Sequence, residues 1–344
     1  MSFKKVIMER FGGPEVLRLV EEENLPGPGS GEVRVKVLKA SANFTDIMIR
    51  EGKYPDVKKK PPFVPGYDMI GLVDAVGGDV TGWKEGELVA DMTVIGAFSE
   101  YICLPADRLI PVPGNLDPSQ AVTLLLSYVT AYQMLKRVAA VQSGQKILVH
   151  GAGGAVGLAL LQLGRLMDLE VYGTASFPKH DRIRENGAVP VDYRNEDVSE
   201  RIMELTGDGV DAVFDPIGGS SFRRSFSVLR KGGKLVAYGF YNAVTGRGGS
   251  IPVDFMRLML WNLLPNGKKS TFYSIGSWRK KHPGWYKQDV NQLFKWLGEG
   301  RIKPVIADHY PLDKVREAQE RIERAGLTGK LIIDIADNVS TPCQ

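Results

Sequence analysis

The chain has 344 residues, of which 43% are hydrophobic and 24% charged, and these fractions are typical of a globular protein large enough for two domains. Lys and Arg number 44 against 40 acidic residues, and a formal charge of +4 is too small to predict a nucleic-acid interface. The two cysteines, Cys103 and Cys343, exclude a disulfide framework and a cysteine-rich zinc site. The start has no signal-peptide pattern and no apolar run is long enough for a membrane span, so we expect a cytoplasmic protein.

Short strands separated by chain-breaking residues are predicted for the first third of the chain. The segment "GEVRVKVLKASA" (31–42) alternates apolar and polar residues with a period of two, as a half-buried strand does. Shorter apolar runs follow at 71–77 and 87–91, and prolines and glycines crowd the connections. Many short strands of this kind predict a partly closed β-barrel.

The pattern changes after residue 120, where a helix is predicted over 121–139. Beyond it, apolar strands alternate with helical patterns, which predicts an α/β fold with a doubly wound parallel sheet covered on both faces. The predicted strands cover 146–150, 170–174, 189–193, 211–215 and 233–239, with helices that begin near 154, 178, 197 and 221. A further strand over 270–276 would form an edge of this sheet.

Two more elements are predicted near the end, an amphipathic helix over 286–300 and an apolar strand over 329–335. The strand has no obvious place in the middle sheet. We therefore expect the chain to return to the first domain, which makes that domain discontinuous. The basic runs 58–60 and 279–281 lie beside prolines or glycines, and we interpret both as solvated loops.

The turn after the first strand of the middle sheet reads "HGAGGAVG". Gly151 permits a tight turn, and Gly153 and Gly154 lack a Cβ, so a diphosphate can lie against backbone N–H groups at the helix N-terminus. Gly157 allows the helix to pack close to the sheet. Because the motif follows a predicted strand and opens a predicted helix, with Ala155 and Val156 in its first turn, it predicts a dinucleotide site.

The end of the next strand indicates which nicotinamide cofactor is bound. A site for NAD places a carboxylate about 20 residues after the glycines to hold the ribose 2′-hydroxyl. Ser176 stands 19 residues after Gly157 (176 − 157), and the strand end has no carboxylate. Ser176 can donate a hydrogen bond to a 2′-phosphate and Lys179 can neutralise it, which favours NADPH. The alternative is that Lys179 only begins the next helix in solvent.

Several segments, taken in chain order, resemble a known family. They include "ASANFTDIMIREGKYP", "PPFVPGYDMIGLVDAVG", "GAFSEY", "VHGAGGAVG", "GVDAVFDPIGG" and "TGKLII". Together they resemble the medium-chain dehydrogenase/reductase superfamily and, within it, the zinc-free quinone oxidoreductase (zeta-crystallin-like) branch, over nearly the whole chain. The longer segment 240–267 is similar to relatives of the VAT-1 protein.

The resemblance implies two domains. A GroES-like, partly closed β-barrel catalytic domain would cover 1–124 and 278–344, and a Rossmann domain that binds NADPH would cover 125–277. The partner would be a small electrophile such as a quinone or an enone. An edge strand near 270–276 would leave backbone groups unpaired, so we expect a homodimer through this edge.

In zinc-dependent members of the superfamily, three ligand positions correspond to Asn43, Tyr67 and Leu126 of this chain. Amide, phenol and aliphatic side chains cannot supply the thiolate, imidazole or carboxylate ligands that zinc needs. The four-cysteine loop of the structural zinc site is also absent from the sequence. We therefore expect no metal and, without a Lewis acid, hydride transfer to an electron-poor acceptor rather than alcohol oxidation.

The resemblance also implies the residues of the catalytic site. Asn43, Tyr54 and Tyr67 form the predicted catalytic set, and Asn43 and Thr130 would hold the nicotinamide. Tyr54 matches a tyrosine that related enoyl-thioester reductases use as a proton donor, and the alternative is an aromatic residue that closes a loop. Thr130 could instead be a buried helix hydroxyl. Asp46 is expected to cap its loop rather than transfer protons.

Further cofactor contacts are implied at the ends of later strands. Tyr193 would lie near the adenosine phosphate, and Gly239 and Phe240 near the nicotinamide. Lys330 would reach the cofactor from the returning segment, and the alternative for Lys330 is a solvated turn. His150 is interpreted as a partly buried residue with its hydrogen bonds satisfied.

The leading hypothesis is an NADPH-dependent quinone or enone reductase. Two alternatives stay open at this point. One is an enoyl-thioester reductase, and the other is a protein that binds NADPH but serves as a non-catalytic scaffold.

Overall fold

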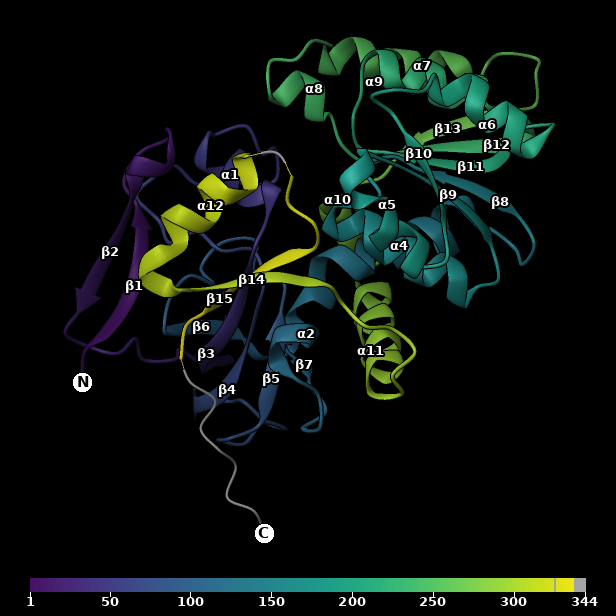
Figure 1. Cartoon of the computed structure of the whole chain (residues 1–344). Helices are drawn as coiled ribbons and strands as arrows, with labels where there is room; N and C mark the ends of the chain where they lie inside the picture. Colours follow the sequence, from purple (N-terminus) through teal and green to yellow (C-terminus); the bar gives the residue numbers. More distant parts are fainter. Residues whose placement is uncertain (325, 337–344) are drawn as a thin grey trace. The chain divides into compact units, whose positions relative to one another are not determined.

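The computed structural model describes residues 1–324 and 326–336, and its contacts divide the chain into two compact units (Figure 1). The first unit comprises Met1–Leu126, Phe294–Gly300 and the described residues from Pro304 onward, and the second comprises Ser127–Leu293 and Arg301–Lys303. Residues 278–293, which we expected in the first domain, thus group with the second unit.

A buried carboxylate explains this grouping. Asp289, only 2% exposed, accepts a hydrogen bond from Gln133 Nε2 at 2.7 Å. Arg137 forms an ion pair with the same carboxylate at 2.6 Å, and its guanidinium lies 4.3 Å from the ring centroid of Trp285. These contacts tie the segment before residue 294 to the helical segment that opens the second unit.

The first unit is built on a sheet of order β14-β15-β3-β4-β5-β7, with β6 also paired to β3. Its strands are β1 (Phe3–Met8), β2 (Leu17–Glu22), β3 (Glu32–Ala42), β4 (Met69–Val76), β5 (Leu88–Asp91), β6 (Tyr101–Pro105), β7 (Ile110–Pro111), β14 (Ile306–Pro311) and β15 (Lys330–Asp334). Its helices are α1 (Phe44–Arg50), α2 (Pro118–Thr123) and α12 (Val315–Glu323). The long strand predicted over 31–42 is β3, whose alternating burial reflects its period of two.

The terminal strand β15 pairs antiparallel with β3, with Leu331 opposite Ala42. The preceding helix α12 is fixed to the N-terminal part of the unit by Arg50. This fully buried guanidinium donates hydrogen bonds to Gln319 Oε1 at 2.7 Å and to the Gly12 carbonyl at 3.0 Å. Segments almost 300 residues apart in the sequence therefore share one core.

The second unit contains a six-stranded parallel sheet of order β10-β9-β8-β11-β12-β13, the doubly wound order that the alternating pattern predicts. The strands are β8 (Lys146–Val149), β9 (Glu170–Ala175), β10 (Val189–Asp192), β11 (Val210–Asp215), β12 (Leu229–Ala237) and β13 (Lys269–Phe272). The helices are α3 (Val129–Gln133), α4 (Ala155–Leu166), α5 (His180–Glu185), α6 (Val198–Thr206), α7 (Ser220–Ser227), α8 (Tyr241–Val244), α9 (Ile251–Trp261), α10 (Ile275–Lys281) and α11 (Pro283–Gly298), the last of which continues into the first unit.

Helices cover both faces of this sheet. Figure 1 shows α4 and α5 on one side and α6, α7 and α9 on the other. Short 3-10 turns cover Pro14–Val16, Ala106–Arg108, Phe177–Lys179 and Leu312–Lys314, and π-helical turns cover Leu124–Tyr128 and Met134–Ala139.

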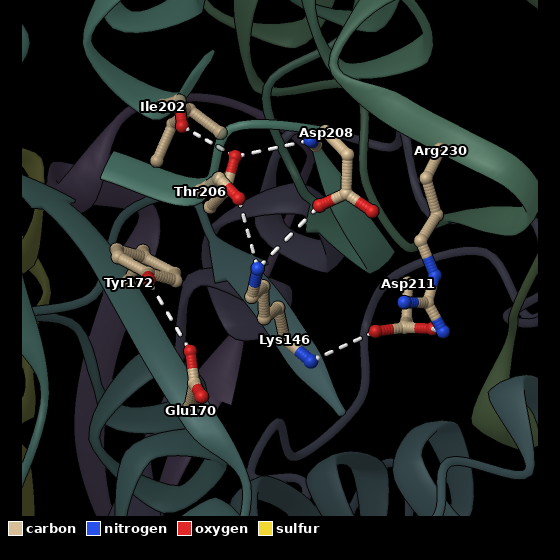
Figure 2. Close-up of polar contacts among 9 residues, drawn as sticks. Lys146, Glu170, Tyr172, Ile202, Thr206, Asp208, Asp211 and Arg230 are labelled. Carbon is tan, nitrogen blue, oxygen red and sulfur yellow. Dashed lines mark hydrogen bonds and ion pairs between the residues drawn. The ribbon is translucent and has the colours of Figure 1, made fainter. Parts of the chain in front are cut away.

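The amino ends of the strands are held by a set of polar contacts (Figure 2). Lys146, the first residue of β8, donates its amide to Asp211 Oδ2 at 2.8 Å and its Nζ to the Thr206 carbonyl at 2.9 Å. Asp211 also forms an ion pair with Arg230 of β12. Because ligands of open α/β sheets bind at the carboxyl ends of the strands, we assign these contacts a structural role.

The edge strand predicted over 270–276 is shorter than expected. β13 ends at Phe272, and α10 begins at Ile275 with the Ser274 side chain as its N-cap. The basic run 279–281, interpreted as a loop, therefore forms the last turn of α10, where positive charge interacts favourably with the helix dipole. The other basic run, 58–60, lies in a loop as predicted.

Candidate functional site

The glycine-rich turn connects β8 to α4. Gly151 has a φ of +66°, a left-handed conformation that glycine adopts without strain. A Cβ on Gly157 would lie 2.4 Å from the Gly151 carbonyl oxygen, so only glycine allows α4 to begin this close to the turn. Gly154 is the N-cap, and Ala155 and Val156 form the first turn, whose amides have no partner within the helix. This helix end can therefore bind an anion.

Lys179 brings a positive charge to this turn. A Cβ on Gly153 would lie 2.6 Å from Lys179 Cδ and 3.5 Å from its Nζ, so the lysine side chain lies against the turn. Lys179 is half-buried and is also the N-cap of α5, so its binding to a phosphate stays a prediction. Its 3-10 turn follows directly on Ser176, the N-cap after β9.

The end of β9 carries Ala175 and Ser176 rather than a carboxylate. Asp181, the next acidic residue, has 92% of its side chain exposed and forms an ion pair with Arg184 at 2.8 Å. The residues present therefore fit a phosphate better than a ribose 2′-hydroxyl, because the position that would repel a dianion lacks negative charge.

The carboxyl ends of three strands meet at Pro216. A Cβ on Gly239, after β12, would lie 2.7 Å from the Pro216 carbonyl oxygen, and one on Gly151 would lie 3.9 Å from Pro216 Cγ. Two predicted positions, Gly151 and Gly239, are thus brought to the same edge. The Phe240 ring stacks on Phe272, the last residue of β13, at 4.8 Å between centroids.

Two further predicted residues of the second unit stand in contrasting surroundings. Thr130 is buried on α3, with 6% exposure. Tyr193 is 52% exposed after β10, and the Arg194 guanidinium lies 5.9 Å from its ring centroid. The predicted contact of Tyr193 with the adenosine phosphate stays a prediction.

In the first unit the structure brings Asn43 and Lys330 together. Lys330, the first residue of β15, is only 4% exposed, and its Nζ donates a hydrogen bond to Asn43 Oδ1. Asn43 Nδ2 in turn donates to the Ser41 carbonyl at 2.8 Å. The alternative of a solvated turn at Lys330 is therefore wrong.

Two fully buried carboxylates complete this cluster. Asp46 Oδ2 accepts a hydrogen bond from the Asn43 amide at 2.8 Å, so Asp46 caps α1 as predicted. Asp68 Oδ1 accepts from the amide and the hydroxyl of Ser41, at 3.0 and 2.5 Å. Within the part of the chain that the structure describes, Asp46 Oδ1 and Asp68 Oδ2 have no hydrogen-bond partner.

Burial determines the charge of this cluster. Desolvation, together with the nearby charge of Asp68, raises the pKa of Asp46 to about 7. Burial also raises the pKa of Asp68, although Lys330 opposes the rise. The pKa of Lys330 is lowered by burial against the attraction of both carboxylates. The cluster can therefore gain or lose a proton near neutral pH.

Tyr54 and Tyr67 form a hydroxyl pair, with 2.6 Å between their Oη atoms and ring planes at 80°. Tyr67 is fully buried, whereas Tyr54 is half-buried. Burial raises the pKa of Tyr54 to about 12, and the Tyr67 hydroxyl opposes the rise. Tyr54 thus keeps its proton at neutral pH.

The backbone next to this pair is strained at Val94. The Tyr67 carbonyl accepts the Val94 amide at 2.9 Å, and Val94 has a φ of +71°. For a β-branched residue this conformation costs about 1–3 kcal/mol.

Sequence patterns alone do not identify three residues of this site, namely Ser41, Asp68 and Val94. The available signal is a polar residue inside or beside an apolar strand, as in "KASA" and "GYDMIG". Such a residue costs free energy when buried unless it finds a partner, so it indicates a polar cluster. No local signal predicts the strained Val94 backbone.

At the three positions where the resemblance would place zinc ligands, the side chains have other surroundings. Asn43 bonds to Lys330, Tyr67 to Tyr54, and Leu126 is a buried aliphatic residue. Across residues 1–324 and 326–336, no group of three or more His, Cys, Asp or Glu side chains is arranged to hold a metal ion. In the same residues no helix combines the length and apolar character that a membrane span requires.

A doubly wound sheet with a glycine-rich turn, joined to a β-rich unit with a buried polar cluster, defines a two-domain protein of the dinucleotide-binding class. Residues 29–114 match the alcohol dehydrogenase GroES-like domain, and residues 187–333 match a family described as zinc-binding dehydrogenase. The chain belongs to the medium-chain dehydrogenase/reductase superfamily, in its zinc-free quinone oxidoreductase branch near VAT-1.

Two human relatives illustrate this placement. The synaptic vesicle membrane protein VAT-1 homolog-like is 32% identical over 353 residues, which cover 99% of this chain and 83% of the relative. Human quinone oxidoreductase is 32% identical over 330 residues, which cover 94% of this chain and 95% of the relative.

Solved structures agree with this placement. The human VAT-1 homolog-like structure matches with a TM-score of 0.83 and 31% identity, over 98% of this chain and 99% of that one. Quinone oxidoreductase of Escherichia coli, solved in complex with NADPH, matches with a TM-score of 0.87 and 27% identity. The match covers 96% of this chain and 100% of that one. The predicted fold class, a GroES-like domain with a Rossmann sheet, is confirmed.

Proposed function

We propose that this protein is an NADPH-dependent oxidoreductase that reduces a quinone or another α,β-unsaturated carbonyl compound without a metal ion. The observation that carries the proposal is the contact of Lys179 with Gly153 in the glycine-rich turn, beside a strand end that lacks a carboxylate. A dianionic 2′-phosphate would be attracted by Lys179 and would meet no opposing negative charge at this end of β9. The NADPH complex of the Escherichia coli relative supports the same cofactor.

The glycine-rich turn and the residues after β9 and β10 would bind different groups of the cofactor. Gly153 and Gly154 lack the Cβ atoms that would keep a diphosphate from the backbone, and the start of α4 supplies N–H donors. Gly151 permits the left-handed turn, and Gly157 lets α4 begin close to it. Ser176 and Lys179 would bind the 2′-phosphate, and Tyr193 would stack near the adenosine. The nicotinamide, when bound, supplies a hydride to the acceptor.

The first unit would supply the groups that hold the acceptor and its proton. After hydride addition to an enone, the negative charge on the carbonyl oxygen needs a donor, and the Tyr54 phenol keeps its proton at neutral pH. Tyr67 would orient Tyr54 through the 2.6 Å contact. Asn43, held by Lys330 and Ser41, would be kept in a fixed orientation for binding the acceptor.

Cofactor choice is tested by calorimetry with NADPH and NADH. We expect wild type to prefer NADPH at least tenfold, and Lys179→Ala to lose most of that preference, because a charge-assisted hydrogen bond contributes about 1.5–3 kcal/mol. Arg184→Ala is the matched control, since it removes a nearby positive charge that pairs with Asp181. Equal affinity of wild type for the two cofactors contradicts the proposal.

The acceptor is tested by NADPH oxidation with quinones, enones and enoyl-CoA thioesters. Turnover of quinones or enones supports the proposal, whereas exclusive turnover of enoyl-CoA indicates an enoyl-thioester reductase. Tight NADPH binding without turnover of any of them indicates a scaffold protein. Dialysis against a chelator should leave the activity unchanged, and its loss would argue for a metal after all.

We also propose that the protein is a homodimer that pairs through β13. This four-residue strand is the last in the sheet order and, within the described chain, it bonds to β12 on one side only. The neighbouring helix α9 and the turn after it expose large apolar side chains, including Met259 at 71% and Leu263 at 78%. An unpaired edge beside an exposed apolar surface is suited to a two-fold partner.

A further inference from the structure

A chain of buried polar side chains lies directly behind the glycine-rich turn. It runs from Thr174 in β9 through His150, which follows β8, and Ser225 in α7 to Asp215 at the end of β11. Their exposures are 2, 5, 0 and 0%. Four polar side chains buried at this depth need a complete set of partners, because an unpaired one costs about 1–3 kcal/mol.

The hydrogen bonds of this chain have a single consistent direction. Ser225 Oγ donates to Asp215 Oδ2 at 2.7 Å, because an ionised carboxylate can only accept. Ser225 has no second hydrogen, so the ring nitrogen Nε2 of His150, 3.0 Å away, must donate to it. Neutral imidazole carries one N–H group, so Nδ1 accepts from the Thr174 hydroxyl at 3.1 Å.

Asp215 is fixed as the acceptor at one end of this row of hydrogen bonds. Its Oδ2 also accepts the Ser221 hydroxyl at 2.7 Å, and its Oδ1 accepts the Ile217 amide at 2.7 Å. With every donor directed at the carboxylate, Ser225 cannot reverse its hydroxyl without breaking a charge-assisted hydrogen bond.

The neutral state of His150 agrees with its surroundings. Burial lowers its pKa, the Asp215 carboxylate opposes this effect, and the Arg224 guanidinium of α7 adds to it. A ring that stays neutral has one donor and one acceptor, which is what Ser225 and Thr174 require.

The other end of this row of hydrogen bonds is the glycine-rich turn itself. Thr174 Oγ1, with its proton directed at His150, accepts the Gly151 amide at 3.3 Å. The Thr174 carbonyl accepts the Ala152 amide at 3.0 Å. Both amides that open the turn are therefore bound to one residue of β9, which holds Gly151 in its left-handed conformation, and the Gly151 carbonyl in turn accepts the Gly154 amide at 2.9 Å.

We propose that His150 is a positioning residue for the dinucleotide turn. Held as the Nε2–H tautomer by Ser225 and Asp215, it orients the Thr174 hydroxyl, which in turn fixes the backbone of Gly151. The inference rests on the proposed function in one respect only, namely that the turn binds NADPH.

The tautomer is tested in the free protein by nitrogen-15 NMR of labelled histidines, with His150→Gln to assign the signal. We expect the proton on Nε2 from pH 6 to 8, and Ser225→Ala should move part of the population to Nδ1. A ring with its proton on Nδ1 in wild type, or a doubly protonated ring at pH 7, would overturn the proposal.

The effect on binding is tested by calorimetry with NADP⁺. Thr174→Val and His150→Leu should each weaken NADP⁺ binding about three- to tenfold, because this is the effect expected from the loss of one hydrogen bond. Thr174→Ser keeps the hydroxyl, and His150→Gln keeps one donor and one acceptor without a titrating ring, so both should bind within about twofold of wild type. Circular dichroism and melting temperature confirm that each variant is folded.

Two outcomes would overturn the positioning role: wild-type affinity in Thr174→Val, or equal weakening in His150→Gln and His150→Leu. Failure of wild type itself to bind NADP⁺ contradicts the proposed function instead. The NMR experiment on the free protein then still supports or overturns the hydrogen-bond chain.

Discussion

Asp46 illustrates at the scale of one residue how burial sets a charge. The carboxyl group is fully buried and uses Oδ2 to cap α1, while Oδ1 has no hydrogen-bond partner in the described chain. Its pKa is raised from 3.8 to about 7, first by desolvation and then by the Asp68 charge. The folded state therefore binds a proton that the unfolded state has already released at pH 5 to 6.

This shift predicts how stability depends on pH. Because the pKa is higher in the folded protein, Asp46 lowers the free energy of unfolding as pH rises from about 4 to 7, by a few kcal/mol at most. Asp46→Asn keeps an acceptor for the Asn43 amide and removes the titration. We expect urea unfolding to show this variant more stable relative to wild type at pH 8 than at pH 5. Asp313→Asn, at an exposed position, should give the same difference at both pH values.

The tyrosine pair predicts two unequal losses of activity. Tyr54→Phe removes the proposed proton donor and should lower kcat for an enone about 100-fold, within the usual range for a positioned acid. Tyr67→Phe removes only the hydroxyl that orients Tyr54, so we expect about a tenfold loss. Steady-state kinetics should show this order, with unchanged NADPH affinity in both variants. A larger effect at Tyr67 would reverse the assigned roles.

At the scale of an element, the turn between β8 and α4 depends on a close approach of backbone to backbone. Gly157→Ala would place a Cβ 2.4 Å from the Gly151 carbonyl oxygen, so α4 must shift away from the turn. We expect NADPH affinity to fall at least tenfold and the melting temperature to drop. Gly284→Ala, in the first turn of α11, meets nothing within 4 Å and should leave binding unchanged while stabilising its helix slightly.

Periodicity and glycine spacing were sufficient to predict most elements. The alternation over 31–42 became β3, and the βα rhythm predicted the six-stranded sheet, because both patterns reflect which faces are buried. The predicted end of this strand, residue 276, was wrong by four residues (276 − 272), because Ser274 acts as the N-cap of α10 and ends the strand before it.

The candidate site could be predicted only in part from spacing and periodicity. The glycine turn is local, so its spacing predicts it. Lys330 and Asn43 meet across 287 positions, and the roles of Asp68 and Thr174 depend on partners in other elements. Such pairs are created by tertiary packing, and no pattern in one sequence specifies them.

At the scale of the whole molecule, the apolar surface of α9 bears on assembly. Substitution of Met259 and Leu263 by Glu would place charges in the proposed interface beside β13, so we expect a monomer by light scattering at concentrations where wild type is a dimer. Met203→Glu on α6, where the side chain is 40% exposed, is the matched control and should remain dimeric. A monomeric wild type would remove the proposal.

The pairing of β15 with β3 also affects how the protein emerges from the ribosome. The strand that completes the first sheet, and with it Lys330, is synthesised after the entire parallel sheet of the second unit. During translation residues 39–42 of β3 must therefore wait for this partner, while β4 and β6 can already pair with the rest of β3 and β8 to β13 can already fold. A nascent chain stalled near residue 300 should accordingly resist proteolysis in its middle while its beginning is still cleaved.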